Sequence, residues 1–257
     1  MARSSGGRSV VASARAESPL KLLEPRRGVM GTAAAVCLVT YGGGMVAADA
    51  IEVELAVEAG ATLLVFTQSS TKVFRGASRQ AVRARVDGTL VLLPDPVAAF
   101  ADAAFAGTVD VELGPDGSAV VLDGFTSGRA AFGERWAMER IDLRTTIRRG
   151  AEVVVDDALR LDRGDGSIGD RLATHEALLT LVAVGQGARP VAEAILREPF
   201  APPTPDLFVA ASPLPRDPDG AILRVAASQP GRALEEVRRR LGNLPEMGVV
   251  DPFASRR

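Results

Sequence analysis

A run of uncharged polar side chains is the part of this sequence best suited to chemistry. The run consists of Thr67, Gln68, Ser69, Ser70 and Thr71. Apolar residues stand on both sides of it, at 63–66 and 73–74. Hydroxyl and amide groups enclosed in this way predict either a hydrogen-bonded buried network or the lining of a wet cavity. A Ser/Thr-rich surface turn between two strands explains the same composition equally well.

The usual motifs for tight metal binding and nucleotide binding are missing from the sequence. With one histidine and one cysteine, a single chain cannot build a His-rich or Cys-rich metal cage. No GxxxxGK[ST] motif occurs, so we expect no nucleotide hydrolysis by this chain. The glycine cluster 42–44 lacks the GxGxxG spacing of a dinucleotide site.

Three carboxylates outside charge runs leave one enzymatic alternative open. Asp49, Asp123 and Glu134 could act as the acid and base of a β-rich hydrolase. Such a pair would have to lie roughly 5–10 Å apart in an open cleft. His175 has aliphatic neighbours and no nucleophile at a suitable spacing, which favours a packed or surface histidine over a general base.

Composition indicates a globular chain that binds neither nucleic acid nor membrane. Thirty basic and 32 acidic residues leave a net charge of −2, which gives no basic footprint for nucleic acid. The longest apolar stretch, 28–41, is too short to cross a bilayer, and no secretory signal is visible. Cys37 lies in this stretch and is expected to be a small core residue. We therefore expect a cytoplasmic protein without disulfides.

The dominant hydrophobic period is two, which indicates half-buried strands. It is clearest in 51–57, 82–86 and 109–113, and shorter strands are expected at 9–14, 119–122, 152–155 and 222–226. Asp-Gly pairs mark turns at 87–88, 116–117, 165–166 and 219–220. The Pro-rich segments 201–206 and 212–220 are expected to be ordered loops or hinges.

Two or three helices complete the expected fold. The segments 171–184 and 190–197 are compatible with helix or strand, whereas 232–241 carries an apolar stripe at helical spacing. Gly242 is placed to cap the last of these helices. The sequence thus predicts one mostly β domain over residues 1–257 with a helix near its C-terminus.

Four segments, in order, resemble the urease accessory protein UreD (UreH) family. They are 6–25, 42–76, 92–105 and 122–147, and they cover about two thirds of the chain continuously. The string Thr67-Gln68…Thr71-Lys72-Val73-Phe74-Arg75 is the most specific match. Two departures stand out: Ala47-Ala48 replaces a Gly-Gly pair, and Phe132 stands where the family commonly has arginine. If either alanine needs positive φ, the strain would cost about 1–2 kcal/mol.

The resemblance implies a non-enzymatic scaffold for nickel insertion into urease. Such a protein binds the urease apoprotein on one side and the UreF–UreG accessory pair on the other, and GTP is used only by UreG. The implied fold is mostly β, with many short strands following a right-handed, β-helix-like path. No permanent cofactor is implied, but nickel could pass through an internal tunnel.

A transit path for nickel would need weak, exchangeable oxygen ligands rather than the histidines and cysteines of a permanent site. The candidate lining residues are Asp49, Thr67, Gln68, Ser69, Ser70, Thr71, Asp123 and Glu134. Lys72 and Arg75 would repel a cation, so we expect them to hold structure or pair with carboxylates. The candidate structural or partner-binding residues are Lys72, Phe74, Arg75, Arg129 and Trp136. Trp136 and Phe132 could anchor an interface or lie in the core, and the core interpretation is favoured for both. A satisfied polar network without transport, and a β interaction module unrelated to nickel, remain alternatives.

Overall fold

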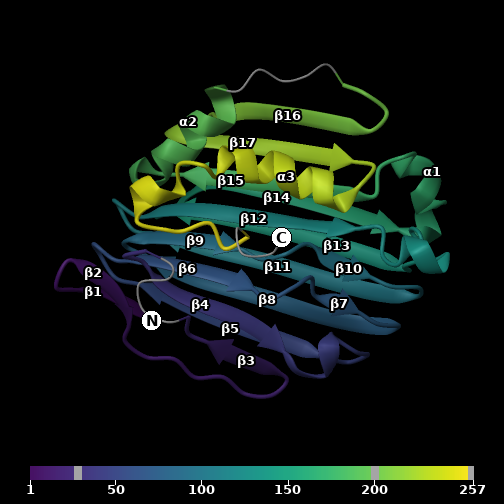
Figure 1. Ribbon diagram of the computed structural model, residues 1–257, viewed down its shortest axis with the longest axis horizontal. Helices are drawn as coiled ribbons and strands as arrows, with labels where there is room; N and C mark the ends of the chain where they lie inside the picture. Colours follow the sequence, from purple (N-terminus) through teal and green to yellow (C-terminus); the bar gives the residue numbers. More distant parts are fainter. Residues whose placement is uncertain (26–30, 198–202, 254–257) are drawn as a thin grey trace.

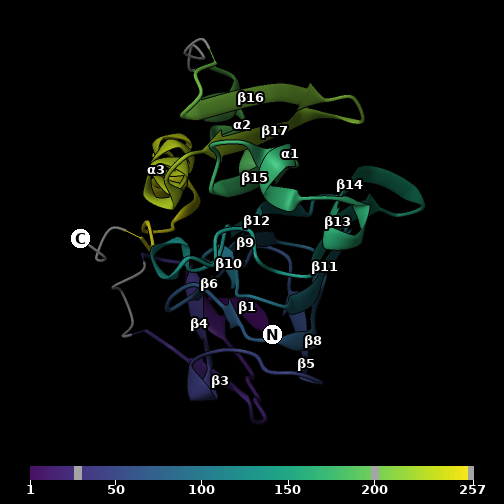
Figure 2. The ribbon, with the colours of Figure 1, turned by 90° about the vertical axis from the view of Figure 1, so that its right-hand side faces the viewer.

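The computed structural model describes residues 1–25, 31–197 and 203–253. The chain is mostly β and winds as a β-solenoid of about three turns (Figures 1 and 2). This confirms the mostly β fold and the helical path of short strands.

Each turn of the solenoid uses one strand from each of two facing sheets. The first sheet contributes β4 (Ala34–Thr40), β6 (Thr62–Thr67), β9 (Thr89–Leu93) and β12 (Ser118–Thr126). The second sheet contributes β5 (Ala50–Val57), β8 (Gly76–Val86), β11 (Ala103–Leu113) and β13 (Arg140–Arg149). Within each sheet these strands are parallel neighbours. The chain therefore alternates between the sheets, crossing through long corners at one edge and short turns at the other.

Further strands extend both sheets beyond the solenoid turns, and they pair antiparallel except where β1 meets β5 in parallel. The seven-stranded sheet has the order β14-β13-β11-β8-β5-β1-β2, and the larger one runs β16-β17-β15-β12-β9-β6-β4-β3. The added strands are β1 (Ala2–Ser5), β2 (Arg8–Val11), β3 (Leu20–Leu23), β14 (Glu152–Asp162), β15 (Ala177–Val184), β16 (Leu207–Leu214) and β17 (Asp217–Ala227). Two short strands, β7 (Lys72–Val73) and β10 (Val97–Ala99), pair with each other and join β12 at the corner edge.

Two hydrophobic cores follow from the alternation in the sequence. One lies between the sheets and includes Ile51, Val53 and Val82, whose neighbours in sequence point outward. The other lies on the outer side of the larger sheet, beneath α2 (Arg189–Arg197) and α3 (Pro230–Arg240). Cys37 is buried in β4, as expected from its apolar surroundings.

The three helices correct or settle several sequence expectations. The ambiguous segment 171–184 divides between the end of α1 (Ile168–Leu172) and β15, because its apolar part is buried on both faces within a sheet. The other ambiguous segment, 190–197, is helical and belongs to α2. Near the C-terminus, α3 confirms the expected helix, but Leu241 rather than Gly242 is its C-cap.

The second Pro-rich segment is not a loop or hinge. Residues 212–220 form the end of β16, a tight turn at Pro215-Arg216 and the start of β17. The expected Asp219-Gly220 turn is therefore wrong, since both residues lie within β17. Pro213 is tolerated because β16 is an edge strand, and Pro218 lies in the bulge of β17 where the register shifts between the pairs Pro213–Ala221 and Leu214–Asp217. Of the first Pro-rich segment, residues 201 and 202 lie outside the described residues, and Thr204 bridges to Leu207.

Within the described residues, no helix is long and apolar enough to cross a membrane.

Backbone strain is present at one of the two alanines that replace glycine. Ala48 has φ of 71°, in the left-handed region that costs a residue with a Cβ about 1–2 kcal/mol. It is exposed, so its methyl group contributes little packing. Ala47 is not among the described residues with positive φ.

We predict that Ala48→Gly stabilises the protein by about 0.5–1 kcal/mol, because relief of strain exceeds the added entropy of the unfolded chain. Denaturant unfolding measures the change. Ala47→Gly is the matched control and should be neutral or destabilising. Equal effects of the two substitutions would show that φ at position 48 is not the cause.

Candidate functional site

The long corners of the solenoid lie above one another along a single edge. They comprise residues 41–49, 68–75, 94–102 and 127–139, which we call the corner stack. Backbone hydrogen bonds join successive corners: the Met45 N–H donates to the Lys72 carbonyl at 2.8 Å, and the Ala98 N–H to the Thr71 carbonyl at 2.9 Å. The in-register sheets thus bring together segments that are 26 to 86 positions apart at their starts (94 − 68 and 127 − 41).

A clasp between Thr67 and Asp95 fixes the start of the polar run. The Thr67 hydroxyl donates to Asp95 Oδ2 at 2.8 Å and accepts the Asp95 N–H at 2.8 Å. Thr67 is buried, with 8% of its surface exposed. Sequence reasoning did not identify Asp95 as a site residue, although its position between Pro94 and Pro96 was a signal for a fixed turn.

The five polar residues predicted as a group do line one hollow. Its volume is about 180 Å³, and its lining comprises Leu20, Leu38, Val39, Thr40, Gly43, Thr67, Gln68, Ser69, Ser70, Thr71, Lys72 and Gln80. Gln68 and Ser69 are exposed at its rim, whereas Ser70 and Thr71 are half-buried. Both the turn and the cavity interpretation of the sequence therefore apply, at different depths.

This hollow adjoins a larger cavity of about 820 Å³ between the two sheets, with which it shares Leu20 and Leu38. The polar run thus lies beside the interior of the first solenoid turn.

The three candidate carboxylates do not join the polar run. Asp49 closes a turn by accepting the Val46 N–H at 2.8 Å. Glu134 is held by Arg129, whose Nε donates to Glu134 Oε2 at 2.9 Å, and it also accepts the Ala101 N–H. The hydrogen bonds from Arg129 lower the pKa of the Glu134 carboxyl.

Asp123 lies in a different groove. This groove, of about 350 Å³, is lined by residues of β12, β13, β14, β15, β16 and β17, and its wall includes Asp157 and Arg224. Burial raises the pKa of the Asp123 carboxyl to about 6, and hydrogen bonds from the Gly124 N–H and the Thr145 hydroxyl oppose that rise. The corner stack and this groove are therefore two separate sites.

Because the pKa of Asp123 is raised in the folded chain, we expect the free energy of unfolding to fall as the pH rises. Between about pH 4 and pH 6 the folded chain holds a proton that the unfolded chain has released, so stability is lost as the pH rises through this range. Asp123→Asn removes that loss. Its stability relative to the natural sequence should increase from pH 4 to pH 7 by at most about 3 kcal/mol.

Denaturant unfolding across this pH range measures the effect. Asp116→Asn, in the exposed turn before β12, is the matched control. A constant difference between Asp123→Asn and the natural sequence at all pH values would contradict the assignment.

Arginine and aromatic side chains hold the corners together. Arg75 pairs with Asp102 of the next corner at 2.8 Å, and Arg163 pairs with the same carboxylate at 3.1 Å. This confirms the expectation that Arg75 pairs with a carboxylate. Hydrogen bonds from Arg163 and Arg75 lower the pKa of Asp102. Lys72 contributes its backbone carbonyl to the Met45 N–H.

The aromatic residues divide between core and surface. Trp136 is buried, packs edge-on against Phe125 at 5.9 Å and donates its indole N–H to the His175 carbonyl at 3.0 Å. It is therefore a core residue. Phe74 packs edge-on against Phe100 at 5.3 Å.

The core interpretation is wrong for Phe132, because 77% of its surface is exposed. The Arg129 guanidinium lies 4.3 Å from the Phe100 ring centre and 5.6 Å from that of Phe132. Because Glu134 also fixes Arg129, the exposed ring rests on a held cation.

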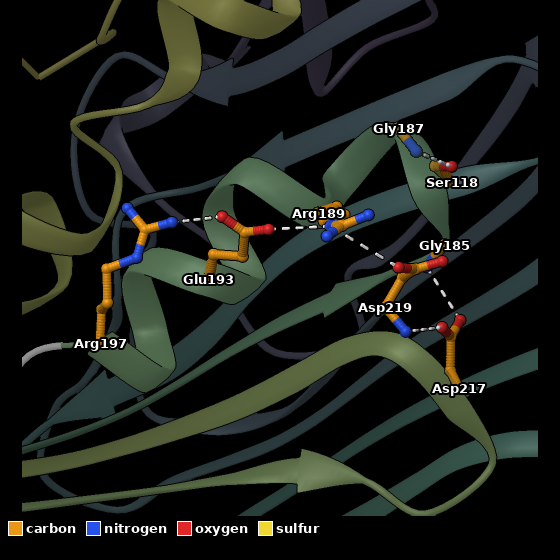
Figure 3. Close-up of polar contacts among 8 residues, drawn as sticks. All are labelled: Ser118, Gly185, Gly187, Arg189, Glu193, Arg197, Asp217 and Asp219. Atoms are coloured by element: carbon orange, nitrogen blue, oxygen red, sulfur yellow. Dashed lines mark hydrogen bonds and ion pairs between the residues drawn. The ribbon is translucent and has the colours of Figure 1, made fainter.

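The opposite edge of the solenoid carries a network that sequence reasoning missed (Figure 3). Asp217 is buried and accepts the N–H groups of Gly185 at 2.9 Å and of Asp219 at 3.0 Å. Ser118 Oγ accepts the Gly187 N–H at 2.9 Å. The glycine loop before α2 resembles an anion-binding loop. However, the N–H groups of Gly185 and Gly187 already donate hydrogen bonds to protein oxygens, those of Asp217 and Ser118. The role of the loop is therefore structural, joining α2 and β17 to the solenoid.

Within the ranges that the structure describes, no group of three His, Cys, Asp or Glu side chains could hold a metal ion.

Comparison with known proteins gives a match over almost the whole chain. The sequence model of the UreD urease accessory protein family matches residues 1–246. A urease accessory protein UreD from Sorangium cellulosum (strain So ce56) is 42% identical over 252 residues, covering 96% of this chain and 80% of the relative. One from Anaeromyxobacter sp. (strain Fw109-5) is 36% identical over 257 residues, covering 96% and 85%. A urease accessory protein D from Oryza sativa subsp. indica is 28% identical over 283 residues, covering 97% and 92%.

Proposed function

This chain belongs to the UreD urease accessory protein family, and from this premise we propose that it holds the urease apoprotein and the accessory proteins UreF and UreG together during nickel insertion. Members of the family are non-enzymatic urease maturation factors. In the proposed assembly GTP is used by UreG alone, and the complex works in the cytoplasm.

The corner stack is the observation that supports this proposal most directly. It contains the polar run with its Thr-Lys-Val-Phe-Arg continuation, the Leu-Pro-Asp-Pro corner and the Gly-Arg…Gly-Glu corner. These segments carry the motifs that most resemble the family, and they lie together on one edge of the solenoid. Their proximity favours a shared role in binding or transfer.

The hydrolase alternative finds no support in the geometry. A pair of acid and base carboxylates must face one substrate. Asp123 lies in the groove beside β17, whereas Asp49 and Glu134 are held within separate corners. Family membership also disfavours an interaction module unrelated to urease.

We propose further that nickel passes through the polar hollow of the corner stack as cargo. The hydroxyl and amide groups of Ser70, Thr71 and their neighbours are weak, exchangeable ligands for a divalent cation. Exchange is what a conduit requires, because the ion must leave as readily as it enters. Asp49, Asp123 and Glu134 lie outside the lining of this hollow, so the proposed path rests on the uncharged residues. A polar network without transport is the competing explanation.

The scaffold role predicts copurification of this chain with urease and the accessory proteins when all are co-expressed. Affinity capture of a tagged copy should recover the urease apoprotein, UreF and UreG. If the urease apoprotein or the accessory proteins were not recovered with the tagged chain, the proposed scaffold role would be contradicted.

The conduit predicts that Ser70→Ile together with Thr71→Ile lowers urease activation severalfold, because two branched apolar side chains would fill the hollow and remove oxygen ligands. Complex assembly should remain intact, as measured by the same affinity capture. Thr108→Ile, on the exposed outer face of β11, is the matched control. Full activation by the double variant would remove these residues from the path and leave the scaffold role standing.

A further inference from the structure

Most of the outer edge of β5 has no neighbouring strand in the described part of the chain. The sheet places β1 beyond β5, but the two are joined only where Ala2 lies opposite Val57. On the other side β8 pairs with β5 along its whole length, from Ala50 to Val57. The free edge over 50–56 therefore presents backbone N–H and C=O groups that can accept another strand.

A cavity lies directly beside this free edge. It is the 820 Å³ cavity between the sheets, whose lining includes residues of β3, β4 and β5. Figure 2 shows β3 and β5 at this end of the solenoid. The walls of the cavity combine apolar side chains of both sheets with a charged rim formed by Arg15, Glu17, Glu52 and Glu54. The apolar walls comprise Val11, Leu20, Leu22, Val36, Leu38, Ile51, Val53, Leu55 and Leu63. Binding pockets for ligands fall in the same range of volume, roughly 300–1,000 Å³.

The outer face of this sheet has a charge pattern that indicates what the next strand should carry. One row across the strands places Glu54, Arg83 and Asp110 side by side, so that acidic and basic side chains alternate. The next row places Arg85, Glu112 and Arg148 side by side with the same alternation. Opposite charges on neighbouring strands stabilise a sheet.

At the edge of the sheet, the first of these rows ends on β5 with an acidic side chain, because the exposed side chains of β5 include Glu52 and Glu54. Glu52 pairs with Arg83 at 3.4 Å, on the side of β8. A further strand on the free side would meet acidic side chains, and basic side chains would continue the alternation.

We propose that the free edge of β5 binds an extended, basic segment of a partner protein as an added strand. Alternate apolar side chains of that segment would enter the cavity between the sheets. Its lysines or arginines would lie outward beside Glu52 and Glu54, and its backbone would pair with that of β5.

A synthetic peptide of alternating lysine and valine is the probe, and fluorescence anisotropy measures its binding to the full chain. Binding should be at least tenfold tighter than that of an alternating glutamate–valine peptide. It should also fall at least tenfold when the backbone amides that would face β5 are N-methylated, because the added strand loses its hydrogen bonds. Both registers of methylation are made, since either set of amides could face β5.

Glu54→Lys should reverse the preference between the lysine and glutamate peptides. Glu112→Lys makes the same charge change two strands away on the same face and is the matched control. It should leave the preference unchanged. Hydrogen exchange should slow at 50–56 when the lysine–valine peptide is bound.

Equal binding of the methylated and unmethylated peptides would overturn the inference and indicate general attraction to acidic surface. No binding of the lysine–valine peptide, or an equal effect of Glu54→Lys and Glu112→Lys, would overturn it as well. The test involves neither urease nor nickel, so its failure would leave the proposed scaffold function untouched.

Discussion

Parallel, in-register pairing of successive strands is the constraint on which the rest of this structure depends. Because β5, β8, β11 and β13 pair without offset, each turn of the chain places its corner beside the preceding one. The same holds for the parallel strands of the other sheet. A one-residue slip would move core side chains to the outer face, so the burial pattern that forms the core also fixes the corner stack.

The two edges of the solenoid use this constraint differently. At the short-turn edge, the Asp217 carboxylate and Ser118 satisfy the backbone of a glycine loop and join α2 to the sheets. At the corner edge, strained residues and exposed groups accumulate: Ala48 and Asp102 have positive φ, and Phe132 is exposed on a held arginine. Strain of this kind persists only where surrounding contacts determine it, and it is frequent at functional sites.

The strands and the polar run were predictable because they depend on local alternation. Ile51–Val57 shows the period of two that the sheet requires, and Thr67–Thr71 line one hollow, as a single run beside buried strands suggested. The divided fate of 171–184 was not predictable, because a buried apolar run fits either helix or strand.

Features of the site that depend on contacts between residues far apart in the sequence could not be predicted from local patterns. Asp123 was grouped with the corner carboxylates, but its place within β12 directs it to another groove. The Thr67–Asp95 clasp joins residues 28 positions apart, and only the stacking of corners brings them together. The turn at Pro215-Arg216 was missed because an Asp-Gly pair nearby gave the stronger local signal.

A role in urease maturation is tested most directly by the nickel content of urease purified from cells that express urease, UreF and UreG, with and without this chain. We expect nickel-loaded, active urease when the chain is present and largely nickel-free urease when it is absent. Equal nickel content in the two preparations would contradict the role of this chain in urease maturation.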